Sequence, residues 1–331
     1  MKVYRGFQDP ALHPRKRCVA IGIFDGVHRA HQLILRKTMQ RARETGALST
    51  VLTFDPHPVK ILSGNKKNPP ILMSLEHRLQ KMKFLGLDEA VVVNFNKRFS
   101  RISREDFLWK YLLKKMGMIF LAIGHDFRFG KNALGDAVFL SKEAGKAGFK
   151  IEVFKPLKDR KSVISSTRIR HLVESGRLDE AGRMLGRPVS IYGTVVKGKG
   201  RGRKLGFPTA NVDPHHETLP PQGVYAVTGQ WGKRPLFGVL HLGQRPTFGE
   251  KQKTVEVHWL DWKANLYGRD LEVFFVKKIR PIQRFSSALD LKSVIQKDIQ
   301  SARRTFLLYI TRINQYNLTS SEYSCVGMFV S

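Results

Sequence analysis

Short apolar runs alternate with amphipathic stretches along the first 185 residues of the chain. The apolar runs predict strands near 18–23, 48–53, 90–94, 118–123 and 150–154. Apolar residues at helical spacing predict helices near 30–44, 75–85, 103–115, 139–147, 167–175 and 178–185. Strands separated by helices of this length form βαβ units, so the pattern predicts a parallel sheet with helices on both faces.

The pattern changes after residues 186–188 (Gly-Arg-Pro). Short alternating runs at 190–196, 223–227, 254–260 and 271–276 are separated by Gly- and Pro-rich turns, and no long helical pattern follows until about 286. This pattern is typical of a small antiparallel barrel or sandwich with one C-terminal helix. We therefore expect a first domain at 1–186, a second at 187–305 and an extension at 306–331, whose structure the sequence does not decide.

The chain is strongly basic, with 58 Lys and Arg residues against 27 Asp and Glu residues and a net charge of +31. A positive field attracts nucleotides, nucleic acids and anionic lipid surfaces alike. The basic residues are spread along the chain, and no RNA- or DNA-binding motif accompanies them. A general bias toward basic proteins and RNA binding are both open explanations of the charge.

The sequence shows no targeting signal and no cysteine pattern typical of disulfides or metal binding. No segment has the pattern of a signal peptide, and no apolar run reaches the length of a membrane span. The two cysteines, Cys18 and Cys325, make neither a disulfide framework nor a metal cluster. We therefore expect a cytoplasmic protein that acts without a membrane.

Residues 22–31 (Gly-Ile-Phe-Asp-Gly-Val-His-Arg-Ala-His) join the first predicted strand to a helix. His28 and His31 therefore lie beside a helix N-terminus, whose free N–H groups and partial positive charge favour a phosphate. A pair of imidazoles there is suited to a reacting phosphoryl group. The alternative is structural: His28 is a helix cap, and His31 is an ordinary, partly buried histidine.

Three further polar strings mark turns of the same domain. They are Thr-Phe-Asp-Pro-His-Pro at 53–58, Gly-His-Asp-Phe-Arg-Phe-Gly at 124–130 and Ile-Ser-Ser-Thr-Arg-Ile-Arg at 164–170. The last string starts a helix, where hydroxyls supply caps and Arg170 can bind a phosphate with two hydrogen bonds. Each string alone is an ordinary turn or cap, but four such clusters in one α/β domain indicate a site.

The second domain carries a Gly- and Lys/Arg-rich segment at 198–211. It lacks the Gly-Lys-Ser/Thr spacing of a Walker A loop, yet six basic residues and no acidic residue lie from Arg187 to Lys204. A solvated turn is the alternative interpretation. Thr209 and Asn211 are two residues apart on a strand, so they face the same way and offer two oxygen ligands to Mg²⁺.

These strings, together with 223–225, 243–248 and 256–258, occur in the order found in a known family. The N-terminal half resembles the FMN adenylyltransferase domain of the bacterial bifunctional riboflavin kinase/FAD synthetases, which are related to nucleotidylyltransferases with a His-x-Gly-His motif. The second half resembles their riboflavin kinase domain. The resemblance covers residues 1 to about 305. It implies an α/β nucleotidylyltransferase-type domain with a Rossmann-like parallel sheet, followed by a small antiparallel β-barrel with a C-terminal helix.

The resemblance also implies two reactions. Glu256, otherwise a surface carboxylate on an alternating strand, would accept the proton of the riboflavin 5′-hydroxyl as it attacks ATP to give FMN. The FMN phosphate would then attack a second ATP to give FAD and pyrophosphate. Mg²⁺ would be held by Thr209 and Asn211, and His28 and His31 would act at the adenylyl-transfer centre.

Further contacts follow from the resemblance. The expected ATP and phosphate contacts are Gly22, Phe24, Asp25, Gly26, Asp126, Ser166, Thr167, Arg170, Gly198, Lys204, Gly206 and Pro208. The expected flavin contacts are Phe54, Pro56, His57, Pro58 and Arg280. The expected partners are these small molecules, with no specific nucleic acid and no membrane; a weak or transient homo-oligomer is a further expectation.

Two residues depart from the family pattern. Ala30 stands where the family has Gly, and its methyl group is expected to weaken ATP use at the crowded helix start. His241 stands where the family usually has Asn. Two alternatives stay open: a riboflavin kinase with a weak or altered first domain, and a basic nucleic-acid-binding protein on this fold.

Overall fold

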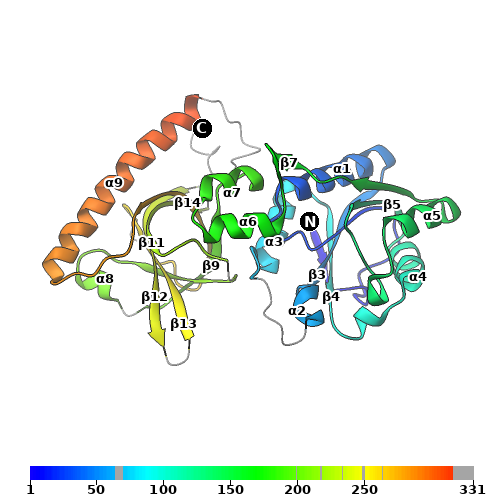
Figure 1. The fold of residues 1–331 in the computed structure, drawn as a ribbon, viewed down its shortest axis with the longest axis horizontal. Coiled ribbons are helices and arrows are strands. Elements are labelled where there is room, and N and C mark those ends of the chain that lie inside the picture. Colours follow the sequence, from blue (N-terminus) through cyan, green and yellow to red (C-terminus); the bar gives the residue numbers. More distant parts are fainter. Residues whose placement is uncertain are drawn as a thin grey trace. The chain divides into compact units, whose positions relative to one another are not determined.

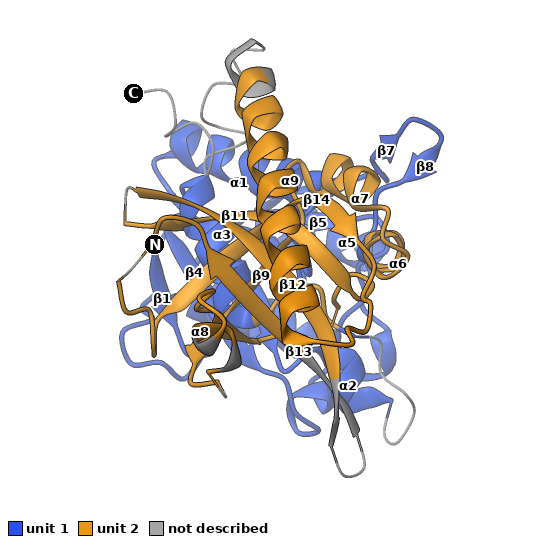
Figure 2. Cartoon of the chain, turned by 90° about the vertical axis from the view of Figure 1, so that its left-hand side faces the viewer, with its two compact units in different colours: residues 1–70, 75–166 blue, residues 71–74, 167–331 orange. Residues whose placement is uncertain are grey.

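The computed structural model describes residues 1–63, 70–198, 200–216, 218–232, 234–247, 250–262 and 264–315. The chain forms two compact units, which Figure 2 shows in different colours. Unit 1 comprises Met1–Pro70 and Leu75–Ser166, and unit 2 comprises Ile71–Ser74 and Thr167–Ser331. The two helices that follow residue 166 therefore belong to the same compact unit as the residues after 186. The predicted division into functional domains after residue 186 stays a prediction.

Unit 1 is built on a six-stranded parallel sheet, which confirms the predicted α/β class (Figure 1). Its strands are β1 (Lys2–Tyr4), β2 (Arg17–Ile21), β3 (Leu48–Asp55), β4 (Glu89–Asn94), β5 (Met118–Gly124) and β6 (Lys150–Phe154). They lie in the order β1-β4-β3-β2-β5-β6, and every neighbouring pair is parallel. The prediction lacks β1 because three residues are too few to show a pattern.

Helices and short turns connect these strands. They are α1 (Arg29–Thr45), α2 (Pro58–Leu62), α3 (Leu75–Leu85), the 3₁₀ turns η1 (Phe99–Arg101) and η3 (Lys131–Ala133), α4 (Arg104–Asp106), the π-helical segment η2 (Phe107–Lys115) and α5 (Ala137–Ala147). A small hairpin of β7 (Lys158–Asp159) and β8 (Ser162–Val163) follows β6. The single helix predicted near 103–115 is therefore α4 continued by η2.

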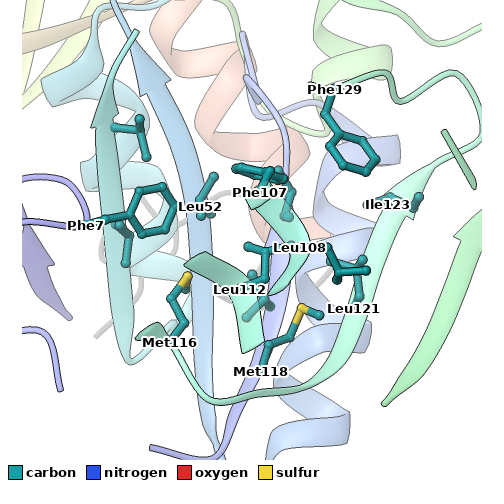
Figure 3. Close-up of a cluster of buried hydrophobic side chains, with 14 of the residues drawn as sticks. Phe7, Leu52, Phe107, Leu108, Leu112, Met116, Met118, Leu121, Ile123 and Phe129 are labelled. Carbon is teal, nitrogen blue, oxygen red and sulfur yellow. The ribbon is translucent and has the colours of Figure 1, made fainter. Parts of the chain in front are cut away.

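A hydrophobic core of unit 1 lies between the sheet and η2 (Figure 3). Phe107, Leu108 and Leu112 of η2 pack with Leu52 of β3 and Leu121 of β5. Each fully buried side chain of this size contributes about 1.5–3 kcal/mol of hydrophobic stabilisation. This core holds the central strands in place, and with them the turns that follow those strands.

Unit 2 contains a closed six-stranded barrel. Of the two predicted architectures, barrel and sandwich, the barrel is therefore the correct one. Its strands are β9 (Ser190–Val196), β10 (Ala210–Pro214), β11 (Gly223–Trp231), β12 (Arg234–Thr247), β13 (Glu250–Trp259) and β14 (Asp270–Arg280). They pair antiparallel in the order β10-β13-β12-β11-β14-β9. The helices α6 (Ser166–Glu174) and α7 (Leu178–Leu185) precede the barrel, and the short α8 (Arg201–Lys204) lies between β9 and β10.

The long helix α9 (Ala288–Gln315) lies on the outer face of the barrel (Figure 2). Its Ala302 and Phe306 pack on Val224, Ala226 and neighbouring apolar residues of β11 and β12. The expected extension therefore begins inside a packed helix at Phe306, and 316–331 lie outside the described residues. Among the described helices, none is both long enough and apolar enough to span a membrane.

A buried ion pair ties the strands of unit 1 together near their amino ends. Arg17 of β2 is fully buried, and its Nε donates to the Glu89 carboxylate of β4 at 2.7 Å. The guanidinium also donates to the carbonyl oxygens of His13 and Met116, and the hydroxyl of Tyr4 donates to Glu89. Burial alone would raise the pKa of Glu89, but the hydrogen bonds from Arg17 and Tyr4 outweigh it and lower that pKa.

The substitution Arg17→Met is expected to destabilise unit 1 by about 3–5 kcal/mol at neutral pH, because it leaves the Glu89 carboxylate buried without its cation. Hydrogen-exchange protection of peptides from β2 to β4 measures this loss in unit 1 alone. Unchanged protection in the variant would contradict the structural role of the pair.

The acid dependence of the same protection gives a second readout. A carboxyl whose pKa is lowered by folding stabilises the protein fully above its unfolded pKa, here the ordinary 4.5, and this stabilisation is lost as the pH falls through the lower folded value. The wild-type protein should therefore lose protection below a pH of about 4.5, and the Arg17→Met protein should lose this part of its acid dependence.

Candidate functional site

Three of the polar strings follow the carboxyl ends of neighbouring parallel strands. Residues 22–28 follow β2, residues 56–58 follow β3, and residues 125–130 follow β5. Strand β2 lies between the other two, so the three turns meet at one edge of the sheet. The chain first adds strands on the β3 side of β2 and then returns to its β5 side, and ligands of parallel sheets bind at such a reversal of strand order.

His28 is the N-cap of α1. Its Nδ1 accepts a hydrogen bond from the backbone N–H of His31 at 3.3 Å, and the residue is 4% exposed. This is the capping role that the structural alternative predicted for His28. Because Nδ1 is an acceptor, the proton of the neutral ring lies on Nε2. The two imidazoles stack with their centroids 3.5 Å apart, and Phe24 meets His31 edge-on.

The turn between β2 and α1 has an unusual backbone. Phe24, Gly26 and Val27 have φ angles of 55°, 83° and 40°, in the left-handed region that favours glycine. Such a conformation costs about 1–3 kcal/mol for a residue other than glycine and is concentrated at functional sites. The carbonyl oxygen of Asp25 accepts a hydrogen bond from the hydroxyl of Ser166 at 2.8 Å. The structure thus brings the fourth polar string to the first through Ser166.

The other phosphate candidates of that string lie on α6. Ser166 begins the helix, and Arg170 is four residues further along, so the two lie on the same helix face. Thr167 and Arg170 belong to unit 2, whereas Ser166 and the turn that it contacts belong to unit 1.

The candidate flavin residues of unit 1 take different places. Phe54 is buried in the core against Phe95 and Phe99. Pro56 follows a cis peptide bond, His57 caps α2 by accepting the Val59 N–H at 3.2 Å, and Pro58 begins that helix. Only the residues after Phe54 therefore lie in the turn itself.

Asp126 lies in the turn after β5 and is strongly exposed, with 83% of its side-chain surface accessible. Its carboxylate is 3.9 Å from Nδ1 of His125. Gly124 leaves room for it, because a Cβ at that position would lie 3.1 Å from the Asp126 carboxylate oxygen.

Arg78 is a residue at this edge that the sequence reasoning missed. It lies on α3, is 4% exposed, and donates to the carbonyl oxygens of Ile23 and Phe54. The signal was its position, because Leu75, Arg78 and Met82 are all buried and form one helix face. A cation on an otherwise apolar helix face requires buried acceptors, and these are the backbone groups of two turns.

The second cluster is a row of residues across the barrel. Asn211 of β10 is paired in register with Glu256 of β13, and Glu256 is paired with His241 of β12. His241 is opposite Val224 of β11, which is in turn opposite Arg280 of β14. Residues directly opposite in an antiparallel pair share a face, at Cβ distances of about 4.5–5.5 Å. Because Val224 packs on α9, this row lies on the outer face of the barrel.

Two glycines of the Gly-rich segment lie against the two candidate metal ligands. A Cβ at Gly198 would be 2.0 Å from Nδ2 of Asn211, and a Cβ at Gly202 would be 3.3 Å from Oγ1 of Thr209. Glycine at these positions therefore lets the segment fold over Thr209 and Asn211. No group of three His, Cys, Asp or Glu residues that could hold a metal ion occurs within the described part of the chain. The assignment of Thr209 and Asn211 as metal ligands stays a prediction from the sequence.

The remaining candidates of the segment have structural roles in the turn. Gly206 has a φ of 87°, and the carbonyl oxygen of Pro208 lies 2.8 Å from Nδ1 of His258. The side chain of Lys204 lies outside the described part of the structure.

On one side of Glu256, the barrel row continues through His241 to Arg280. Burial lowers the pKa of His241 below its ordinary 6.5, an effect that the Glu256 carboxylate partly offsets, so His241 is neutral at neutral pH. Arg280, a candidate flavin residue, makes a bidentate pair with Asp298 of α9 at 2.8 Å and lies over the ring of Phe285. This pair fixes Arg280 at the end of the row.

Two family models match the chain. The model described as FAD synthetase matches residues 11–168, and the model described as riboflavin kinase matches residues 185–306. The bifunctional riboflavin kinase/FMN adenylyltransferase of Escherichia coli (strain K12) is 38% identical over 308 residues, covering 92% of this chain and 98% of the relative. The protein of the same name from Pseudomonas fluorescens is 37% identical over 306 residues, covering 92% and 97%.

A solved structure agrees with the fold over almost the whole chain. The crystal structure titled as a macrolide-efflux protein from Streptococcus pneumoniae superposes with a TM-score of 0.77 at 27% identity. It covers 91% of this chain and 98% of that one.

Proposed function

Because the chain belongs to the bifunctional riboflavin kinase/FMN adenylyltransferase family, we propose that its two clusters divide the two reactions. The enzyme phosphorylates riboflavin to FMN with ATP, and it adenylylates FMN to FAD with a second ATP. The sheet edge of unit 1 would perform the adenylyl transfer, and the barrel row would perform the phosphorylation. The observation that carries this division is that each matched segment contains one of the two clusters.

In the kinase reaction, Glu256 accepts the proton of the riboflavin 5′-hydroxyl as that oxygen attacks the γ-phosphorus of ATP, and ADP leaves as the bond to the bridging oxygen breaks. A general base must be unprotonated before the reaction, and the residue paired in register with Glu256, His241, is neutral. Arg280 at the far end of the row is the proposed flavin contact. Its pairing with Asp298 holds the guanidinium in one place.

Thr209 and Asn211 fit Mg²⁺, because a hydroxyl and an amide oxygen are hard donors of the kind this ion prefers. Bound there, Mg²⁺ would neutralise charge on the ATP phosphates. Gly198, Lys204, Gly206 and Pro208 are the proposed phosphate contacts of the same segment. The close fit of Gly198 against Asn211 supports this assignment, since the backbone of the segment lies beside the candidate ligand.

In the adenylyl transfer, the FMN phosphate attacks the α-phosphorus of ATP, and pyrophosphate leaves. His28 would donate from Nε2 to a phosphate oxygen, because its Nδ1 is engaged by the backbone. His31 stacks on it and would contribute to the same centre. Positioning and charge stabilisation carry most of the rate enhancement in such transfers.

The other adenylyl-site residues are assigned by the family motif. The proposed ATP contacts are Gly22, Phe24, Asp25, Gly26 and Asp126, together with Ser166, Thr167 and Arg170 of α6. The proposed flavin contacts are Pro56, His57 and Pro58, with Phe54 supporting them from the core. Cytoplasmic location and a weak homo-oligomer stay predictions, the first supported by the need for ATP.

Separate loss of the two activities tests the division. Glu256→Gln should lower riboflavin phosphorylation by about 10²–10⁴-fold, the usual worth of a general base, while the conversion of FMN to FAD stays intact. His28→Asn should do the reverse, because Asn is as strong an N-cap as any residue but lacks the imidazole. Chromatographic separation of FMN and FAD after incubation with Mg–ATP measures both rates.

The choice of His28→Asn keeps the helix start intact, so its effect reports on chemistry. Loss of both reactions in either folded variant would contradict the two-site assignment. Retention of both reactions in both variants would contradict the residue roles.

Ala30 gives a second test, and it addresses the alternative of a weak first domain. The residue lies in the first turn of α1 and is half-buried. Ala30→Gly should raise kcat/KM for FAD formation severalfold, because it removes the methyl group beside the proposed triphosphate site. It should also lower helix stability by about 1 kcal/mol, the cost of glycine in a helix. An unchanged kcat/KM would show that Ala30 does not limit ATP use.

A further inference from the structure

Unit 1 contains two buried arginines with different surroundings. Arg17 is paired at short range with the Glu89 carboxylate. Arg78 instead directs its guanidinium at backbone carbonyls and a hydroxyl at the carboxyl ends of β2 and β3. We propose that Arg78 is a positioning residue for adenylyl transfer, which holds the histidine-bearing turn after β2 against the turn after β3. This proposal rests on the assignment of adenylyl transfer to that edge of the sheet.

The hydrogen bonds of Arg78 join the two turns directly. One terminal nitrogen donates to the carbonyl oxygen of Ile23 at 2.5 Å and to Oγ1 of Thr53 at 3.0 Å. The other donates to the carbonyl oxygen of Phe54 at 3.4 Å. The hydroxyl of Thr53 in turn donates to Ile23 at 3.2 Å, so the three groups close a small ring.

The residues of this ring are close in the sequence to the proposed reactive and flavin-contacting groups. Ile23 directly precedes the left-handed residue Phe24 and is five residues before His28. Phe54 is two residues before Pro56, which begins the proposed flavin-contacting turn. A shift of the Arg78 side chain would therefore move the turn after β2 relative to the turn after β3.

The charge of Arg78 is supported by carboxylates around it. Burial lowers the pKa of Arg78, and Asp25, Asp55 and Glu76 counteract this effect. The Asp55 carboxylate lies 3.8 Å from the guanidinium, beyond close hydrogen-bond distance. The guanidinium therefore acts chiefly as a forked donor to backbone groups, and its charge is balanced by several acids rather than by one partner.

Lysine cannot replace this arrangement. Its ammonium is a single point of charge, whereas the planar fork of arginine donates in two directions at fixed spacing. Arg78→Lys keeps the charge and loses the simultaneous contacts to Ile23 and Phe54. Since a misplacement of about 1 Å in a reacting pair costs about 10²-fold in rate, the expected defect is in kcat.

The experiment measures steady-state FMN-to-FAD conversion in the full-length enzyme, with riboflavin phosphorylation as an internal control. Arg78→Lys should lower kcat for FAD formation by about tenfold or more, with KM for ATP and FMN within about threefold of wild type. Riboflavin phosphorylation should stay within about twofold. Arg17→Lys is the matched control: it also alters a buried arginine of unit 1, and it should lower hydrogen-exchange protection without this selective loss of kcat.

A milder variant covers poor folding of Arg78→Lys. Thr53→Val keeps the side-chain shape and removes the hydroxyl that bonds both Arg78 and Ile23, so it should lower kcat for FAD formation severalfold. Wild-type kcat in both Arg78→Lys and Thr53→Val, or an equal loss in Arg17→Lys, would overturn the positioning role.

His28→Asn separates this outcome from failure of the proposed function. Loss of FAD formation in His28→Asn with full activity in Arg78→Lys and Thr53→Val would overturn only the role of Arg78. Full FAD formation in His28→Asn would overturn the assignment of the edge itself, and the role of Arg78 with it.

Discussion

The common direction of β3, β2 and β5 is the constraint on which the proposed adenylyl-transfer centre depends. Parallel pairing puts the carboxyl ends of these strands at one edge, so turns far apart in the sequence meet there. Sheet geometry alone does not fix the turns to one another. Arg78 joins the turn after β2 to the end of β3 through the carbonyl oxygens of Ile23 and Phe54, and Ser166 joins the start of α6 to the same first turn, which contains the left-handed residues.

In the barrel, the register of the strands brings together residues that are far apart in the sequence. Antiparallel pairing aligns Asn211, Glu256 and His241 on neighbouring strands, so three residues spread over more than forty positions of sequence form one row. Their outward direction follows from alternation, because Val255 and Val257 on either side of Glu256 are buried. A shift of one residue in β13 would turn Glu256 into the barrel interior. The two units thus place polar groups by different rules, edge alignment in one and register in the other.

The sequence pattern predicted most of this framework because apolar periodicity reflects burial. Strands β2 to β6 and helices α1, α3 and α7 lie close to their predicted ranges. Strand β12 escaped prediction because glycines and prolines such as Pro235 and Gly238 interrupt its alternation, while pairing on both sides keeps it a strand. The strand that the sequence analysis expected at Thr209 and Asn211 is β10, which begins one residue later, at Ala210, and is only five residues long.

The candidate residues could be named from their motifs, but their contacts could not. The cap made by His28 was foreseen as an alternative, whereas the burial of Phe54 and the pairing of Arg280 with Asp298 depend on long-range packing. Arg78 has no motif at all, and its partners are backbone groups that any sequence would supply. The roles of these residues in catalysis stay predictions.

The two proposed centres act in succession, and the FMN made by one is the substrate of the other. The most direct measurement mixes the Glu256→Gln and His28→Asn proteins and supplies riboflavin with Mg–ATP. Each protein alone should form little FAD, and the mixture should form it readily, because FMN released by one protein is adenylylated by the other. Absence of FAD from the mixture, with both proteins folded, would contradict the account.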